Sequence, residues 1–240
     1  MKGVVHLILF IVLSSTLKAQ EISILFIGNS LTYTNDLPTI LKDVARLSYI
    51  KITTKSITNP NYGLEDHWKD NEIQSVISNC HFDFVIFQQG PSSQTYGRSS
   101  LIEFGGEIAK LCRKYGAKPV YFMVWPSINY YHTIDGVIAN YQDAAELNNA
   151  LLCPVGSVWL EYRNSVGATE LYSIDGFHPS KKGSILASLT LLETLFPGTL
   201  NKITEDRQFN KWLSPTESSK LIPIIKTTLN DLSAKKNNNN

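Results

Sequence analysis

Short apolar runs alternate along the chain with longer segments that mix polar and apolar positions. The run ISILFI at 22–27 is almost wholly apolar, which is typical of a strand that is covered on both faces. A helix is predicted after it, because Asp36 is a good N-cap, Pro38 lies just inside the helix, and the pattern continues to about Ser48. Further strands are predicted at 50–57, 82–87, 119–125 and 153–159, and further helices at 64–79, 101–116, 134–151 and 181–196.

This order of elements predicts an α/β fold. Strands that alternate with helices form a parallel sheet, and right-handed crossovers place the helices on both of its faces. In such sheets ligands bind beyond the carboxyl ends of the strands. Polar residues that directly follow the predicted strands are therefore the first candidates for a functional site.

Composition narrows the classes of function. The chain has 240 residues, 18% of them charged, and a net charge of +1. This length suits one α/β domain, and the absence of a basic stripe gives no indication of a nucleic-acid partner. The sequence contains neither a glycine-rich phosphate loop nor a histidine or carboxylate cluster with metal-ligand spacing, so we expect no cofactor and no metal.

The three cysteines, Cys80, Cys112 and Cys153, also fit no metal spacing. One disulfide with one free thiol is the alternative in an exported protein. Three small core residues are the favoured interpretation, because each cysteine lies in or beside an apolar segment.

The first residues have the pattern of a secretory signal peptide. Lys2 precedes an apolar stretch at 4–13, and small and polar residues lead to Ala19, where cleavage is predicted. The apolar stretch is too short for a permanent membrane span. We therefore expect export to the periplasm or the extracellular space without stable membrane insertion. Residues 20–200 are predicted to form the domain, and 201–240 a helical appendage with a disordered tail; the oligomeric state stays open.

Two short motifs carry chemistry. GNS ends the first predicted strand and places Ser30 just beyond its carboxyl end, and DGFHPS precedes the last core helix. A serine hydroxyl becomes a nucleophile when a base takes its proton, and an imidazole is suited to that role. A carboxylate on the far ring nitrogen fixes the imidazole tautomer. Ser30, His178 and Asp175 supply these three groups.

At these residues the chain resembles the SGNH hydrolases, also called GDSL esterases and lipases. GNSLT is similar to their first block, with Asn29 in place of the commoner aspartate, and DGFHPS is similar to their last block. The resemblance covers about 22–196 and implies a three-layer, flavodoxin-like fold with a five-stranded parallel sheet. It implies that Ser30 is the nucleophile, His178 the base and Asp175 its orienting partner. It also implies an oxyanion hole that contains the N–H groups of Ser30 and Gly63.

One block departs from the family pattern. Most members have Gly-x-Asn-Asp after the third strand, and the asparagine amide completes the oxyanion hole; this chain has FVIFQQGPSS. A glutamine amide offers the same donor on a longer arm. Gln88 is expected to take the role, with Gln89 as the alternative, since neighbouring strand residues point to opposite faces.

Three further residues are candidate substrate contacts: Gln89, His67 and Trp125. His67 lies four residues after Gly63 in a predicted helix, and Trp125 ends the fourth predicted strand. The alternative for His67 is a half-exposed surface position, and the alternative for Trp125 is packing in the core.

The resulting functional hypothesis is an exported serine esterase that hydrolyses small acyl esters. O-acetyl groups on carbohydrate are the best single substrate, on the basis of the predicted export and of tyrosines in the loop after Trp125. A lipase or thioesterase is one alternative. Another is a carbohydrate-binding or structural protein that keeps the scaffold and has lost catalysis, which the atypical third block suggests.

Overall fold

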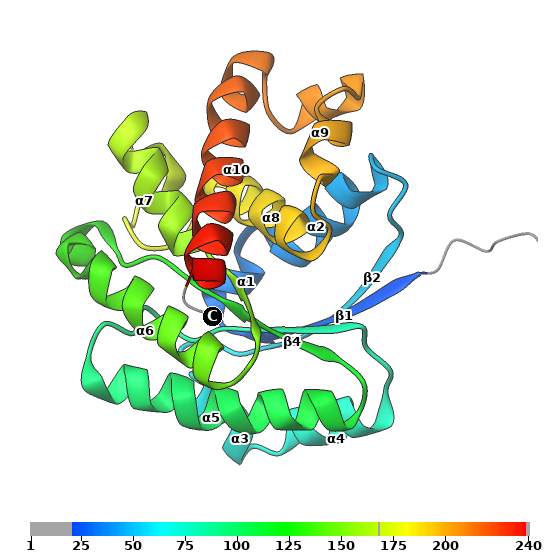
Figure 1. The fold of residues 1–240 in the computed structure, drawn as a ribbon, viewed down its shortest axis with the longest axis vertical. Helices are drawn as coiled ribbons and strands as arrows, with labels where there is room; N and C mark the ends of the chain where they lie inside the picture. The colour runs from blue at the N-terminus through cyan, green and yellow to red at the C-terminus, as the bar shows by residue number, and fades with distance from the viewer. Residues whose placement is uncertain (1–20, 168, 239–240) are drawn as a thin grey trace, which may run out of the picture.

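Five parallel strands form the central sheet in the computed structural model, which describes residues 21–167 and 169–238 (Figure 1). The strands are β1 (Ile22–Gly28), β2 (Ile52–Thr58), β3 (Phe84–Phe87), β4 (Lys118–Phe122) and β5 (Leu151–Cys153), and their order in the sheet is β2-β1-β3-β4-β5. The register pairs Ile27 of β1 with Ile57 of β2 and with Phe87 of β3, so these three strands end side by side. The predicted five-stranded parallel sheet is confirmed.

Helices cover both faces of this sheet (Figure 1). One layer contains α3 (Leu64–Lys69), α4 (Glu72–Asn79), α5 (Thr95–Lys114) and α6 (Ile134–Leu147). The other contains α2 (Leu37–Arg46), α7 (Val155–Ser165), α8 (Lys181–Leu195), α9 (Thr199–Ile203) and α10 (Pro215–Asn238). A single turn of helix, α1 (Ser30–Tyr33), links β1 to α2 through a 3₁₀ turn at Thr34–Asp36. The predicted three-layer α/β/α architecture is confirmed.

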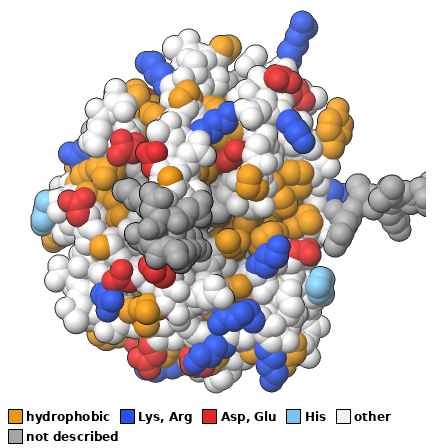
Figure 2. Space-filling view, viewed as in Figure 1, with side chains coloured by type: hydrophobic (Ala, Val, Ile, Leu, Met, Phe, Trp, Pro, Cys, Tyr) orange, Lys and Arg blue, Asp and Glu red, His pale blue; other side chains and the backbone are white. Residues whose placement is uncertain are grey.

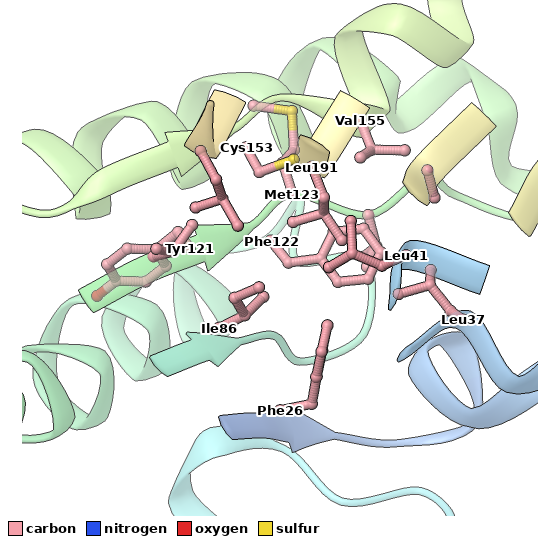
Figure 3. Packing of buried hydrophobic residues seen from close by; sticks show 14 of the residues in the cluster. Phe26, Leu37, Leu41, Ile86, Tyr121, Phe122, Met123, Cys153, Val155 and Leu191 are labelled. Carbon is pink, nitrogen blue, oxygen red and sulfur yellow. The ribbon is translucent and has the colours of Figure 1, made fainter. Parts of the chain in front are cut away.

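The core explains why β1, β3 and β4 are apolar at most positions, whereas the edge strand β2 is polar at 53–56. Phe26, Ile86 and Phe122, from three adjacent strands, are each at most 1% exposed. They lie beneath Leu41 of α2 and Leu191 of α8, which are fully buried (Figure 3). Because helices cover the opposite face as well, the alternate strand positions are equally apolar.

The predicted fifth strand at 153–159 is wrong in its extent. The strand ends at Cys153, Pro154 precedes α7, and the rest of the run is helical. Val155, Val158, Trp159 and Tyr162 are buried at helical spacing, so the apolar run has the period of a helix once Tyr162 is included. A short apolar run is compatible with a strand or a helix. The residues that follow the run show which of the two elements forms.

The predicted helix at 64–79 is two helices. α3 ends at Lys69, and α4 begins after Asn71, whose φ of 61° lies in the left-handed region. Asparagine adopts this conformation more readily than most residues. The break turns the chain between two short amphipathic helices.

The C-terminal residues extend the core of the domain. α10 packs against α7 and α8 (Figure 1), and Leu221 and Ile225 are at most 1% exposed. The backbone continues as helix to Asn238, where the sequence analysis expected a disordered tail. Positively and negatively charged side chains are interspersed on the face that carries α10 (Figure 2).

Two other expectations concern the termini and the cysteines. The predicted signal peptide, 1–19, lies outside the described residues, and within the described part no helix has the length and apolarity needed to cross a bilayer. All three cysteines are free thiols. Cys112 and Cys153 are buried as expected for core residues, and burial raises the pKa of the Cys112 thiol to about 12. Cys80 is exposed and is not a core residue.

Candidate active site

The chemistry-bearing segments meet at the carboxyl edge of the sheet. Asn29–Ser30 follows β1, Tyr62–Gly63 follows β2, and Gln88–Gly90 follows β3. Because the strand order is β2-β1-β3, the serine turn lies between the other two segments. The turn at 173–180, which contains Asp175 and His178, leads into α8.

Ser30 is the first residue of α1. Asn29 is its N-cap, with extended backbone, and the Asn29 Oδ1 accepts a hydrogen bond from the Leu31 N–H at 3.1 Å. This is the ordinary way in which asparagine starts a helix. The Ser30 N–H has no hydrogen-bond partner in the described part of the chain, so it is free to donate to a ligand.

Asn29 also binds both neighbouring segments. Its Nδ2 donates to the Tyr62 carbonyl at 2.9 Å, and its Oδ1 accepts from the Gln88 Nε2 at 2.8 Å. An aspartate could not donate to Tyr62. Asparagine at this position therefore has a physical reason: it must accept from Gln88 and donate to Tyr62 at the same time.

Gln88 does not offer a donor to the site as the sequence analysis expected. It is fully buried, and its Nε2 donates to Asn29 Oδ1 and, at 3.1 Å, to Thr32 Oγ1. An amide nitrogen has two hydrogens, and both are used. The amide cannot be reversed, because Asn29 Oδ1 is held as an acceptor by the Leu31 N–H. Gln88 positions the serine turn from below.

Gln89, the alternative donor and candidate substrate contact, is also fully engaged. Its Oε1 accepts from the Leu64 N–H at 3.3 Å and from Ser100 Oγ at 2.9 Å. Its Nε2 donates to Ser92 Oγ at 2.8 Å and to the Gly97 carbonyl at 3.1 Å. The side chain joins β3 to α3 and α5, and it leaves no amide hydrogen for substrate.

Gly63 has extended backbone and precedes α3, as expected for a residue at the site edge. Its N–H donates to Asp66 Oδ2 at 2.8 Å. This is the interaction by which an acidic residue in the first turn caps a helix. Asp66 is exposed to solvent, so the carboxylate that holds this N–H can move away from it.

His67 lies inside the molecule and not at its surface. It is 1% exposed, and its Nε2 lies 2.8 Å from the Gly28 carbonyl oxygen. A carbonyl only accepts, so the imidazole has its hydrogen on Nε2. Burial lowers the pKa of His67 and keeps the ring neutral. The predicted substrate contact is wrong, and so is the alternative of half-exposed surface: His67 supports the end of β1.

The base is held by a compact turn. Asp175 Oδ1 accepts from the Ser173 hydroxyl at 2.7 Å and from the N–H groups of Phe177 and His178 at 2.9 and 3.0 Å. Asp175 Oδ2 lies 2.6 Å from His178 Nδ1. The hydrogen bond from His178 holds the pKa of Asp175 well below its usual range, and backbone and hydroxyl donors add to the effect. Gly176, with a φ of 68°, gives the turn its left-handed residue.

Trp125 supports this turn from the core. Its side chain is fully buried, and its ring stacks on Trp159 with centroids 3.7 Å apart. The Trp125 Nε1–H donates to the Phe177 carbonyl at 3.2 Å. Packing in the core, the alternative stated for Trp125, is therefore what the structure shows, and a substrate contact is not.

Asn35 joins the two halves of the site. Its Nδ2 donates to the Pro179 carbonyl at 2.9 Å and to Ser184 Oγ at 3.0 Å. Asn35 follows the serine helix closely, and Pro179 directly follows His178, so this amide holds the nucleophile and base segments together. The Ser30 hydroxyl has no hydrogen bond to His178 among the described residues; in free enzymes such contacts are often long and tighten with substrate.

Sequence reasoning missed Asn35, although a signal was present. Asn35 and Asp36 both have positive φ, 58° and 55°, and an Asn-Asp pair before a helix-starting proline is a sign of such a turn. In the described part of the chain, histidine, cysteine and carboxylate side chains form no group of three that could hold a metal ion. Ser30, His178 and Asp175 place a hydroxyl, an imidazole and a carboxylate at one edge of the sheet.

The chain was compared with protein families, with curated proteins and with solved structures. A scan against protein-family models finds no match, and a search of curated proteins finds no relative. Among solved structures, a candidate SGNH hydrolase from Slackia heliotrinireducens is 26% identical with a TM-score of 0.62, over 73% of this chain and 100% of that one. A DUF4886 family protein from Bacteroides uniformis has a TM-score of 0.71 at 16% identity, over 88% and 95% of the two chains.

The esterase EstA from Pseudoalteromonas, in a structure inhibited by monoethylphosphonate, has a TM-score of 0.57 at 14% identity, over 72% of this chain and 96% of that one. The protein therefore has the fold of the SGNH/GDSL hydrolases, and the resemblance seen in its GNS and DGFH blocks is confirmed at the level of the fold.

Proposed function

We propose that the protein is a serine esterase that hydrolyses small acyl esters. The observation that carries the proposal is the Asp175–His178 pair, bonded at 2.6 Å and tied by Asn35 to the segment that begins with Ser30. In this proposal the Asp175 carboxylate keeps a hydrogen on His178 Nδ1, which leaves Nε2 as the base. No cofactor takes part.

The reaction follows from these roles. The Ser30 hydroxyl attacks the ester carbonyl while His178 takes its proton, and the alcohol leaves with that proton to give an acyl-enzyme. Water, deprotonated by His178, then attacks the acyl carbon. The bond to Ser30 Oγ breaks, the acid leaves, and His178 returns the proton to Ser30. The Ser30 N–H is the first oxyanion donor. The Gly63 N–H is the second and becomes available when the exposed Asp66 carboxylate releases it.

The proposed substrate is an O-acetyl ester on carbohydrate, encountered after export. Tyr33 on α1 and Tyr130 in the loop after β4 are 41% and 66% exposed and offer aromatic surface that suits a sugar ring. A longer acyl group, as in a lipid or thioester, is the alternative within the same chemistry. A series of p-nitrophenyl esters from acetate to decanoate separates the two: the proposal requires kcat/KM to be highest for acetate.

The test of the chemistry uses p-nitrophenyl acetate and the Ser30→Ala variant. Turnover should fall to the background rate in Ser30→Ala. A reactive p-nitrophenyl phosphonate should add one phosphonyl group to Ser30 in the wild type, detected by mass spectrometry, and none in the variant. Hydrolysis that persists unchanged in Ser30→Ala would exclude Ser30 as the nucleophile and with it the proposed catalytic triad. Release of acetate from acetylated polysaccharides then tests the substrate class.

A second function has specific support. Gln88, Gln89 and the Gly63 N–H are all engaged within the protein, which leaves few donors for an oxyanion. A protein that keeps the scaffold and binds carbohydrate without catalysis would show this pattern. Binding of an acetylated oligosaccharide by calorimetry, with neither acetate release nor phosphonylation, would favour this alternative.

A further inference from the structure

The oxyanion hole of the proposed esterase lacks a side-chain donor on the β3 side. The residues after β3 are Gln88, Gln89 and Gly90. Both hydrogens of each glutamine side-chain amide are donated to acceptors within the protein. Each donor in an oxyanion hole typically contributes about 100- to 1,000-fold to kcat. A catalytic site here needs a replacement, and the backbone is the remaining source.

The backbone of Gln89 is fixed by a buried tyrosine. Tyr141 on α6 is fully buried, and its hydroxyl donates to the Gln89 carbonyl at 2.7 Å and accepts from the Gln89 N–H at 3.3 Å. The N–H and C=O of this residue therefore point the same way, as in an extended strand, and that direction is toward α6. The Gln88 N–H points the other way, to the Ile27 carbonyl of β1 at 3.1 Å.

The direction of the next N–H follows. The described residues contain no cis peptide bond, so the Gly90 N–H points opposite to the Gln89 carbonyl. It faces away from Tyr141 and toward the side on which β1 and the serine turn lie, as the Gln88 N–H does. The parallel register pairs Ile27 with Phe87, so the segments that contain Ser30 and Gly90 leave neighbouring strands at the same edge of the sheet.

The Gly90 N–H is also available. It has no hydrogen-bond partner among the described residues, whereas the Gly90 carbonyl accepts from Ser92 Oγ at 2.9 Å. A Cβ on Gly90 would meet no atom within 4 Å, so the space beside this peptide is open. Pro91 follows and limits the freedom of the turn.

We infer that the Gly90 N–H, aimed by the Tyr141 hydroxyl, is the oxyanion donor that replaces the family's third-block asparagine. The inference rests on the proposed esterase function. As the bond from Ser30 Oγ to the ester carbon forms, the C=O π pair moves to oxygen and the serine proton moves to His178. The Gly90 N–H donates to that oxygen, beside the Ser30 N–H. When the C=O re-forms, the alcohol leaves with the proton from His178.

The direct test removes one hydrogen. Replacement of Gly90 by glycolic acid through nonsense suppression exchanges the amide for an ester and leaves every side chain in place. With p-nitrophenyl acetate, kcat should fall about 100- to 1,000-fold, with little change in KM. Phosphonylation of Ser30 should slow in parallel, since that reaction also develops charge on oxygen.

The matched control is glycolic acid at Gly116. This residue follows α5 and precedes β4, at the opposite edge of the sheet. Its N–H donates to the Arg113 carbonyl at 3.3 Å, so the exchange also removes one backbone hydrogen bond. We expect its kcat to match the wild type. A folded glycolic-acid enzyme at position 90 with wild-type kcat would overturn the inference.

Tyr141→Phe tests the positioning. The variant releases the Gln89 peptide, and kcat should fall about 10- to 100-fold with KM little changed, as expected for a misplaced catalytic group. Tyr121→Phe is the control, because Tyr121 is equally buried and its hydroxyl donates to the Leu101 carbonyl at 2.7 Å. Both variants should melt earlier, and only Tyr141→Phe should lose kcat.

An equal loss of kcat in the two tyrosine variants would contradict the positioning role. Failure of the esterase function itself gives a different result, since Ser30→Ala would then keep the wild-type rate. If Ser30→Ala is inactive and the glycolic-acid enzyme is normal, the esterase proposal stands and the Gly90 inference falls.

Discussion

The two halves of the site are built in opposite ways. On the nucleophile side, Asn29, His67 and Gln88 are at most 7% exposed, and their partners come from three different strand ends. On the base side, the side chains of His178 and Asp175 are 33% and 47% exposed, and every side-chain hydrogen bond of Asp175 joins it to a residue at most three positions away. The side-chain hydrogen bonds on the nucleophile side are buried and long-range, whereas those of the Asp175 carboxylate are local and exposed, in a turn that Trp125 and Asn35 attach to the rest of the fold.

Because of this difference, substitutions in the two halves should affect stability and activity to different extents. A buried polar group that loses its partner keeps its desolvation penalty, so changes on the nucleophile side should weaken the fold and the site together. An exposed turn regains hydrogen bonds from water, so changes on the base side should affect the reaction alone. Isosteric substitutions in each half test the contrast.

The largest effect is expected for Asp175→Asn. The asparagine can keep the Oδ1 contacts that shape the turn, but its Nδ2 faces His178 Nδ1 and selects the wrong tautomer of the imidazole. We expect kcat for p-nitrophenyl acetate to fall about 10,000-fold. The urea midpoint should move little, because the turn is exposed. A large loss of stability with modest loss of kcat would contradict the contrast.

Gln88→Glu should have the next largest effect, on stability. The change replaces the donor nitrogen by a carboxylate oxygen that faces Asn29 Oδ1 and Thr32 Oγ1 in a fully buried position. We expect the free energy of unfolding to fall by roughly 3–5 kcal/mol, measured in urea. Gln94→Glu, at an exposed position before α5, is the control and should stay near the wild type. Equal stability of the two variants would show that the buried network is not tightly coupled.

Asn29→Asp should have a smaller effect in the same direction. The aspartate can still accept from Leu31 and Gln88, but it places an oxygen against the Tyr62 carbonyl, where the asparagine donates at 2.9 Å. We expect a loss of about 1–3 kcal/mol in stability. The kcat should fall as well, since the Tyr62–Gly63 segment loses its tie to the serine turn. Unchanged stability would mean that the Tyr62 bond is dispensable.

His67 should give the smallest effect, seen as a pH dependence. Its pKa is lower in the folded protein than the value of about 6.5 expected in the unfolded chain, so the unfolded state binds more protons. The contribution of His67 to stability is therefore present above about pH 6.5 and is lost as the pH falls below it, by at most about 1.4 kcal/mol per pH unit. Unfolding in urea from pH 7.5 to 5.5 measures the slope.

The controls for this slope are two glutamine variants. His67→Gln should flatten it, whereas His81→Gln, at an exposed position, should keep it. If the free energy of unfolding depends on pH equally in the wild type and in both variants, titratable groups other than His67 cause the dependence.

The contrast between the halves also explains what the sequence could predict. The spacing of Asp175 and His178 across Gly176 brings the two side chains together within one turn, so the pair could be recognised without knowledge of the fold. The central strands and the carboxyl edge of the sheet followed from apolar runs, and the edge strand β2 followed from alternation with helices. These features depend on neighbours in the chain.

The roles of Gln88, His67 and Trp125 depended on partners far along the chain. Gln88 points to Asn29, His67 to Gly28, and the Trp125 ring lies on Trp159. Residue type and position gave the right location for each, at the end of a strand or the start of a helix. They did not give the direction of the side chain, which the packing of three strand ends determines. The wrong prediction of a strand at 153–159 has a similar origin, because the helical spacing of this segment shows only when the residues after it are included.

The amide of Asn35 has one more consequence, for synthesis of the chain. The serine leaves the ribosome long before the histidine, and the contacts from Asn35 to Pro179 and Ser184 cannot form until the start of α8 has emerged. A nascent chain that stops before this point would carry an inert hydroxyl. Ester hydrolysis would thus appear only after the start of α8 has emerged, and its onset would report when this segment docks on Asn35.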